Sequence, residues 1–218
     1  MISTVIFDLD QTLVDRQATM ARFLTIQHAK FERHLNTPTD TFVETILRHQ
    51  KNGYADKHDA YQQACAELGE DVSLAKVLLD DLQTYYGHDA VLFDRVPETL
   101  ATLSKTYTLA CITNGRTVGQ TAKLESSGIK PWFAVIKISE AVGVKKPDHR
   151  IFQACLDALN VDASVCVYIG DNPTNDITPA KELGMKAIWM RNAFYTSPDD
   201  CDGIVDKISE IPALLTQL

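Results

Sequence analysis

Short runs of apolar and β-branched residues recur along this chain, and most of them end abruptly at a polar residue. The runs cover residues 4–7, 107–113, 134–139, 165–170 and 187–191. Helix-like stretches cover residues 97–105, 117–128, 148–159 and 176–184, and a last short strand or loop and a helix follow at 204–218. Continuous apolar strands that alternate with helices are typical of a parallel sheet with helices on both faces. The sequence therefore predicts an α/β fold with a doubly wound parallel sheet as a Rossmann-like core.

The stretch from residue 15 to residue 92 breaks this alternation. It contains no comparable strand, and its apolar residues recur at helical spacing, as in the stripe Met20, Phe23 and Leu24. The economical interpretation is a helical insert between the first two strands (residues 15–92, called the helical cap below for its resemblance to a known type of insert). Residues 1–14 and 93–218 then form the catalytic core.

The composition limits the partners of such a fold. The 218 residues include 29 acidic and 21 basic side chains, and the net charge of −8 argues against a nucleic-acid polymer or an anionic membrane surface as the main partner. No apolar run approaches the ~18 residues of a membrane span. The five cysteines are an odd number, widely spaced and without a Cys-x-x-Cys pair, which indicates reduced thiols. We therefore expect a cytoplasmic protein.

Polar side chains of catalytic type gather where the predicted strands end. In an open parallel sheet, ligands bind beyond the carboxyl ends of the strands. The residues at or just after these ends are Asp8, Asp10, Thr113, Asn114, Lys146 and Asp171. We expect the sheet to bring them together at one rim, although they lie far apart in the sequence.

The side chains at this rim suit phosphoryl chemistry. Two aspartates two residues apart, together with Asp171, form an all-oxygen ligand set that favours Mg²⁺ over zinc or copper. Lys146 adds a positive charge and Thr113 a hydroxyl, so that the rim could hold a phosphoryl group. An aspartate can also act as the nucleophile in phosphoryl transfer, while a second one donates a proton and then activates water.

Four ordered motifs carry a resemblance to a known family. Residues 8–13, with the sequence Asp-Leu-Asp-Gln-Thr-Leu, resemble the first motif of the haloacid dehalogenase-like (HAD) hydrolase superfamily. Residues 112–115 resemble its second motif, residues 139–147 its third and residues 170–176 its fourth. The resemblance covers essentially residues 2–191, and the helical cap matches the insert that many members carry after the first motif.

The resemblance implies a role for each acidic residue at a matching position. Asp8 would be the nucleophile and Asp10 the general acid and base. Mg²⁺ would be bound by the Asp8 carboxylate, the Asp10 backbone carbonyl and Asp171. Asp176 would lie in or just behind the metal shell and orient a ligand or a water. A simpler role for Asp176 is to cap the helix that follows it.

The resemblance also implies the phosphate site and the reaction type. Thr113, the Asn114 backbone and Lys146 would hold the phosphate. Dehalogenating and phosphonate-cleaving members replace the second aspartate of the first motif, so the presence of Asp10 favours hydrolysis of a phosphate ester. Gln11 stands where many members have glycine, which bears on the local backbone rather than on the chemistry.

These features predict a Mg²⁺-dependent phosphatase that hydrolyses a small phosphorylated metabolite through an aspartyl-phosphate. Residues 112–152 look closest to the nucleotidase-like branch, which includes 5′-nucleotidases, but sugar phosphates and phosphoglycolate also suit a capped site. The alternatives are a phosphomutase that uses the same nucleophile on a sugar phosphate, a receiver-like phospho-signalling module and a catalytically inactive binding protein. A receiver-like module would need a phosphoacceptor after a third strand, whereas residues 50–60 have a helical pattern.

The helical cap is expected to govern which substrate reacts. Both of its connections to the core lie next to the predicted catalytic rim, so closure there would cover the site and exclude water. The candidates for contact with the leaving group are Arg16, Arg22, Tyr85 and Tyr86.

Overall fold

The core is a six-stranded sheet in which all neighbouring strands are parallel, in the order β3-β2-β1-β4-β5-β6. The strands are β1 (Thr4–Phe7), β2 (Thr108–Thr113), β3 (Val135–Ile138), β4 (Cys166–Gly170), β5 (Lys186–Met190) and β6 (Gly203–Val205). This computed structural model describes residues 1–53 and 55–218. The strand order changes direction next to β1, which is the point where doubly wound sheets bind their ligands.

Alternate side chains of each strand enter two different apolar cores, one on each face of the sheet. On β1, Val5 and Phe7 belong to the first core and Ile6 to the second. The helices that cover the first face are α5 (Val96–Leu103), α6 (Thr117–Ser126) and α10 (Ile211–Leu215). The helices that cover the second face are α8 (His149–Leu159) and α9 (Thr178–Glu182). Because both faces of the sheet are buried, most strands correspond to continuous apolar runs in the sequence.

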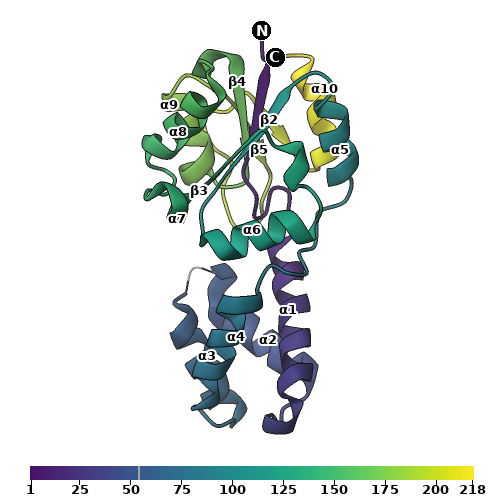
Figure 1. Ribbon diagram of the computed structural model, residues 1–218, viewed down its shortest axis with the longest axis vertical. Helices are drawn as coiled ribbons and strands as arrows, with labels where there is room; N and C mark the ends of the chain where they lie inside the picture. The colour runs from purple at the N-terminus through teal and green to yellow at the C-terminus, as the bar shows by residue number, and fades with distance from the viewer. Residues whose placement is uncertain (54) are drawn as a thin grey trace.

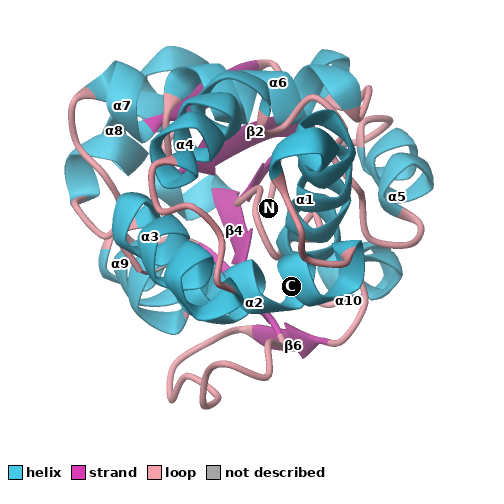
Figure 2. Cartoon of the chain, turned by 90° about the horizontal axis from the view of Figure 1, so that it is seen from below, coloured by secondary structure: helices cyan, strands magenta, loops and turns pink. Residues whose placement is uncertain are grey.

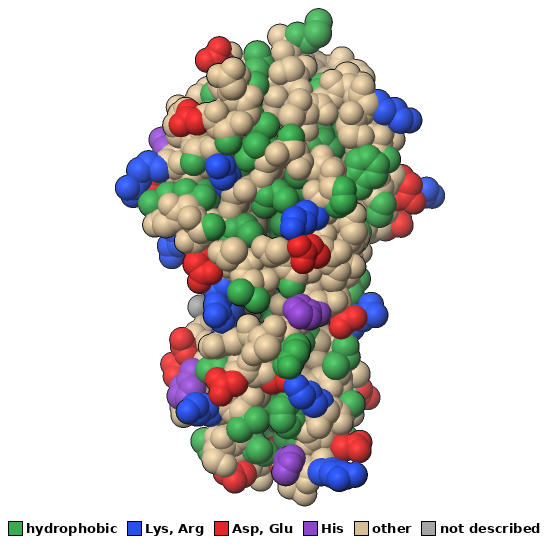
Figure 3. Space-filling model, in the orientation of Figure 1, with side chains coloured by type: hydrophobic (Ala, Val, Ile, Leu, Met, Phe, Trp, Pro, Cys, Tyr) green, Lys and Arg blue, Asp and Glu red, His purple; other side chains and the backbone are tan. Residues whose placement is uncertain are grey.

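The helical cap has a core of its own. Its helices are α1 (Arg16–Phe31), α2 (Thr39–Gln50), α3 (Lys57–Leu68) and α4 (Leu74–Tyr85). Phe42, Tyr61 and Leu78 are fully buried among them. In Figure 1 these helices form a bundle below the sheet, and the space-filling view in Figure 3 shows a narrower waist between the two parts.

The two connections between the core and the helical cap lie side by side. The Asp15 backbone N–H donates to the Val91 carbonyl (2.8 Å), and Val14 pairs with Leu92 in an antiparallel bridge. The Asp15 side chain also accepts from the backbone N–H of Ala18 (2.8 Å) and so starts α1 directly after the chain leaves the core. The carboxyl ends of the strands point toward the helical cap (Figure 1), and Figure 2 shows the same arrangement from the side of the helical cap.

The predicted fold class is confirmed, and each predicted strand agrees with the structure to within one residue at either end. The helix predicted over residues 176–184 is present as α9 but is shorter than predicted. Residues Pro173–Ile177 form a π-helical turn, and α9 begins only after it. A short helix, α7 (Ser139–Val142), lies where no helix was predicted. Within the two described ranges, no helix combines the length and the apolar character that crossing a bilayer requires.

Candidate active site

Asp8 follows the last residue of β1 and is fixed by a buried lysine. Its backbone N–H donates to the Ile169 carbonyl (2.9 Å), and its Oδ1 accepts from Lys146 Nζ (2.6 Å). Lys146 Nζ also donates to Asp176 Oδ1 (2.6 Å) and to the Tyr168 hydroxyl (3.0 Å). Burial works against the lysine charge, but the charges of Asp176 and Asp8 raise the pKa of Lys146 well above its usual value. Lys146 is therefore an ammonium that orients the Asp8 carboxylate.

Three buried carboxylates meet beside this lysine. The oxygens of Asp8, Asp171 and Asp176 lie within 4.8 Å of one another. Asp171 is held from β5 and the loop that follows it, because its Oδ2 accepts from Asn192 Nδ2 (2.7 Å) and its carbonyl accepts from Trp189 Nε1 (2.7 Å). Burial, together with the neighbouring carboxylates, raises the pKa of Asp8 to about 7 and that of Asp171 to about 8. A buried, all-oxygen set of like charges fits a hard divalent cation such as Mg²⁺.

Asp176 has partners on both carboxylate oxygens. Oδ1 accepts from Lys146, and Oδ2 accepts from the backbone N–H of Asn172 (3.0 Å). The Asn172 side chain in turn accepts from the backbone N–H groups of Thr174 and Asn175 (both 3.0 Å), which starts the π-helical turn. Asp176 therefore joins the loop after Asp171 to Lys146.

Asp10 lies two residues beyond Asp8 and interacts with α6. Lys123 Nζ donates to both of its carboxylate oxygens (2.6 and 2.7 Å), and Gln120 Nε2 donates to Oδ2 (3.1 Å). Gln120 also donates to the Thr113 hydroxyl (2.5 Å). Although burial acts in the opposite direction, the charges of Lys123 and Arg16 lower the pKa of Asp10. Asp10 is therefore a carboxylate in this arrangement.

The turn that carries Asp10 has a strained residue. Gln11 has φ +64°, in the left-handed region that favours glycine, and its N–H donates to the Val14 carbonyl (2.7 Å). This position requires the left-handed conformation for the tight turn between β1 and α1, a conformation that glycine adopts more readily than other residues.

The remaining predicted residues lie next to these. Asn114 Nδ2 donates to the Lys146 carbonyl (3.0 Å), and the Lys146 N–H donates to Asn114 Oδ1 (2.8 Å), so the loops after β2 and β3 are tied together. Thr113 ends β2 and is 1% exposed. A cavity of about 230 Å³, hereafter the catalytic cavity, is lined by all seven predicted site residues, namely Asp8, Asp10, Thr113, Asn114, Lys146, Asp171 and Asp176.

Two of the four candidates in the helical cap face this region. Arg16 lines the catalytic cavity, and both Arg16 and Tyr86 line a larger cavity beside it. Arg22 lies at the surface 3.8 Å from Asp89, and Tyr85 is 48% exposed, so neither lines these cavities.

Three residues that hold the site were not predicted. Gln120 and Lys123 lie three residues apart on α6, which places them on one face of that helix. Gln120 and Lys123 lie outside the four motifs, so the motifs do not point to them. The helix that follows Asn114 and Gly115 starts at the rim, however, and its inward face could have been predicted to contact the site. Asn192 gives no such signal, because it lies in an irregular segment after β5.

Comparison with known proteins assigns the family. Residues 5–190 match the model of the haloacid dehalogenase-like hydrolases. The chain therefore belongs to the haloacid dehalogenase-like hydrolase family, as the four motifs indicated.

Individual relatives differ in the substrate that they are named for. Glyceraldehyde 3-phosphate phosphatase of Methanocaldococcus jannaschii is 28% identical, over 100% of this chain and 99% of its own length. Pyrimidine 5′-nucleotidase YjjG of Escherichia coli is 34% identical, over 42% of this chain and 41% of its own length. The crystal structure of the HAD-hydrolase YfnB from Bacillus subtilis, described as putative and bound to magnesium, covers 98% of both chains with a TM-score of 0.77 and 22% identity. This last likeness concerns the fold alone.

Proposed function

We propose that this protein is a Mg²⁺-dependent phosphatase that hydrolyses a small phosphate monoester through an aspartyl-phosphate on Asp8. The observation that carries the proposal is the buried contact of Lys146 with Asp8 and Asp176, beside a second carboxylate on Asp10 that belongs to a separate hydrogen-bonded group. One carboxylate is thereby oriented for attack and the other for proton transfer. The relatives named as phosphatases support the same reaction.

In the first step, the Asp8 carboxylate attacks phosphorus and the ester P–O bond breaks. Lys146 and the Thr113 hydroxyl bind the phosphoryl oxygens, and Asp10, carrying a proton, gives that proton to the leaving oxygen. In the second step, ionised Asp10 takes a proton from water, and the water oxygen attacks the phosphorus of the aspartyl-phosphate. Inorganic phosphate leaves and the Asp8 carboxylate is restored. Asp10 beside Lys123 is ionised, which is the form that the second step needs, so the proton used in the first step has to reach Asp10 from solvent or with the bound phosphate ester.

The metal site belongs to this proposal. Asp8 and Asp171 would hold Mg²⁺ with the Asp10 carbonyl, and Asp176 would keep Lys146 and the loop after Asp171 in place. When bound, Mg²⁺ neutralises the gathered carboxylates and the charge on the phosphoryl group. We also propose that the enzyme works in a reducing compartment, the cytoplasm, because its five cysteines are free and four of them are buried.

The test is release of inorganic phosphate by the purified protein from a panel of phosphorylated metabolites with Mg²⁺. Activity should disappear in excess EDTA and return with Mg²⁺, and Ca²⁺ should restore it poorly because its coordination is longer and more variable. Asp8→Asn should abolish turnover, and Asp10→Asn should lower it by about 10²–10⁴-fold. Unchanged phosphate release by folded Asp8→Asn overturns the mechanism. Isomerised sugar phosphate without phosphate release shows a phosphomutase instead.

A further inference from the structure

A second cavity, hereafter the cap cavity, opens between the catalytic rim and the helical cap. Its volume is about 600 Å³, and it shares six lining residues with the catalytic cavity, namely Asp10, Arg16, Gly53, Asn114, Lys146 and Asn175. The basic residues in its lining are Arg16, Lys57, Arg116, Lys123, Lys145 and Lys146, whereas Asp10 is its one acidic residue among the described part of the chain. In a protein with a net charge of −8, this local excess of positive charge requires a physical reason.

Several of these cations already have partners. Lys123 is paired with Asp10, and Lys146 with Asp8 and Asp176. Arg16 and Lys57 differ from them. Within residues 1–53 and 55–218, neither has a carboxylate oxygen within 4.0 Å of its charged group.

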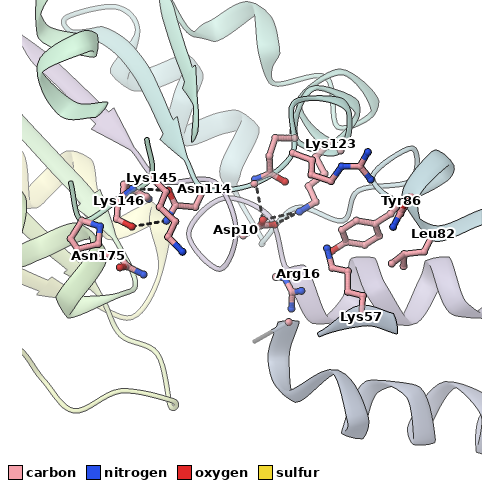
Figure 4. Close-up of a pocket in the computed structure, with 17 residues that line it drawn as sticks. Asp10, Arg16, Lys57, Leu82, Tyr86, Asn114, Lys123, Lys145, Lys146 and Asn175 are labelled. Carbon is pink, nitrogen blue, oxygen red and sulfur yellow. Dashed lines mark hydrogen bonds and ion pairs between the residues drawn. The ribbon is translucent and has the colours of Figure 1, made fainter. Parts of the chain in front are cut away.

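The Arg16 guanidinium lies in the space between the core and the helical cap. Arg16 is the first residue of α1, and it lines both cavities. A Cβ added at Gly53 would lie 1.8 Å from its Nη2, and Gly53 has φ +85°. In this conformation the guanidinium therefore occupies the space that a side chain at residue 53 would take. Figure 4 shows Arg16 lying between Asp10 on the core and Lys57 on the helical cap.

Lys57 occupies a position that disfavours a cation in three ways. It is half-buried, and it starts α3, where the helix dipole is unfavourable for positive charge. Burial and the charges of Arg16, Lys123 and Arg116 lower the pKa of Lys57. An anion bound between Arg16 and Lys57 would offset all three effects, and the planar Arg16 group can bind a carboxylate or phosphoryl group with two hydrogen bonds.

We infer that the leaving group of the substrate carries a second negative charge, as a carboxylate or a second phosphoryl group, and that Arg16 and Lys57 bind it in the cap cavity. This inference rests on the proposed phosphatase function. The phosphoryl group that reacts at Asp8 is bound on the core side, so the remainder of the substrate extends past Asp10 toward these two cations. The substrate class is therefore phosphorylated carboxylic acids and bisphosphates, rather than monophosphates whose leaving group is an uncharged alcohol or sugar.

The experiment compares substrates that differ only in this charge. The matched pairs are 3-phosphoglycerate with glycerol 3-phosphate, and fructose 1,6-bisphosphate with fructose 6-phosphate. In at least one pair, the anionic member should have a kcat/KM at least tenfold higher. A preference in the first pair identifies a carboxylate, and a preference in the second identifies a phosphoryl group. Equal or reversed kcat/KM values in both pairs overturn the inference.

Variants then connect the preference to the two cations. Lys57→Met and Arg16→Met should each reduce the ratio of kcat/KM within the preferred pair by tenfold or more, and Lys57→Arg should keep most of it. Lys76→Met, an exposed lysine on α4 of the same helical cap, is the matched control and should leave the ratio unchanged. A preserved ratio in both folded Met variants overturns the assignment to these residues.

Failure of the proposed function is distinguishable from failure of this inference. If no substrate releases phosphate, p-nitrophenyl phosphate included, the phosphatase proposal is wrong and the inference falls with it. If both members of each pair are hydrolysed equally, the phosphatase proposal stands and only the inference is wrong.

Discussion

Asp10 has a different environment from Asp8, although only one residue separates them. Asp8 shares Lys146 with Asp176, whereas Asp10 is bound by Lys123 and Gln120 from α6. Each carboxylate therefore has its own lysine, Lys146 beside Asp8 and Lys123 beside Asp10. Different neighbours thus set the protonation state of each aspartate.

Lys123 is expected to position Asp10 for proton transfer. Lys123→Met keeps the volume of the side chain but removes both hydrogen bonds to Asp10, so we expect kcat to fall by about 10–100-fold, less than for loss of the acid and base itself. Lys123→Arg should restore part of the activity, because a guanidinium can still donate to the carboxylate. Steady-state kinetics with p-nitrophenyl phosphate measures the effect.

The matched control is Lys130→Met. Lys130 lies just after α6 and, like Lys123, pairs with a carboxylate, that of Glu125, but this pair is solvent-exposed. Exposed pairs of this kind contribute about 0–1 kcal/mol to stability, and Lys130 lies outside both cavities. Equal losses of kcat in the Lys123 and Lys130 variants would contradict a positioning role.

Several of the motif residues were accessible from the sequence because they lie at the end of a strand or directly after it. Thr113 and Asp171 are examples, since the end of an apolar run fixes the position of the next polar side chain in a parallel sheet. Partner residues such as Lys123 and Asn192 reach the same rim from other elements. Their placement depends on how α6 and the segment after β5 pack, which a local pattern does not contain.

At the scale of elements, the helical cap contains a buried polar group that the apolar stripes in its sequence do not predict. Gln27 on α1 is fully buried, and its Nε2 donates to the Leu78 carbonyl (2.8 Å) and to Asp81 (3.1 Å) on α4. The Tyr61 hydroxyl on α3 donates to Gln27 Oε1 (2.8 Å), and Lys30 pairs with Asp81. One side chain thus joins three of the four helices.

We expect Gln27→Ala to lower the free energy of unfolding by about 2–4 kcal/mol, because it leaves buried polar groups unpaired and opens a cavity. Tyr61→Phe removes one hydrogen bond from the same group and should cost only about 1 kcal/mol. Urea denaturation followed by circular dichroism measures both. A loss below about 1 kcal/mol for Gln27→Ala would show that the helices are held by their apolar core alone.

The start of α9 differs from the prediction for a local reason. The sequence predicts a helix over residues 176–184, but Pro173–Ile177 form a π-helical turn and the helix begins at Thr178. The wider turn lets the Asp176 side chain reach back to the Asn172 N–H and to Lys146. π-Turns of this kind are frequent at functional sites, and a periodicity of 3.6 residues does not distinguish them from an ordinary helix.

At the scale of the whole molecule, folding brings like charges together at the meeting point of its two parts. The catalytic cavity gathers Asp8, Asp171 and Asp176, and the cap cavity gathers basic side chains, of which Arg16 and Lys57 have no carboxylate partner in the described part of the chain. Each group is destabilised by its own repulsion and burial in the free protein. If the proposals above hold, binding a divalent cation and an anionic substrate would relieve two separate electrostatic costs.

The acidic cluster predicts how the stability of the metal-free protein changes with pH. The pKa of Asp8 is raised to about 7 and that of Asp171 to about 8 by burial and neighbouring carboxylates, from an ordinary value of 3.8. Between about pH 4 and pH 8 the folded chain therefore binds more protons than the unfolded chain. The contribution of these groups to stability is complete below pH 4 and is lost as the pH rises through 7 and 8.

Thermal unfolding in EDTA should accordingly show a Tm that falls between pH 5 and pH 8, by about 5 °C or more if the loss is about 2 kcal/mol. On the proposed metal site, Mg²⁺ would bind the deprotonated carboxylates of the folded state only, so the Tm increase that it produces should grow over the same interval. Asp171→Asn removes one of the titrating groups and should raise the metal-free Tm at pH 8 while reducing the Mg²⁺ effect.

Asp199→Asn, at an exposed position, is the control and should change neither the metal-free Tm nor the Mg²⁺ effect. A metal-free Tm that is flat or rises from pH 5 to pH 8, or a Mg²⁺ effect that does not depend on pH, would show that this cluster is not the metal site.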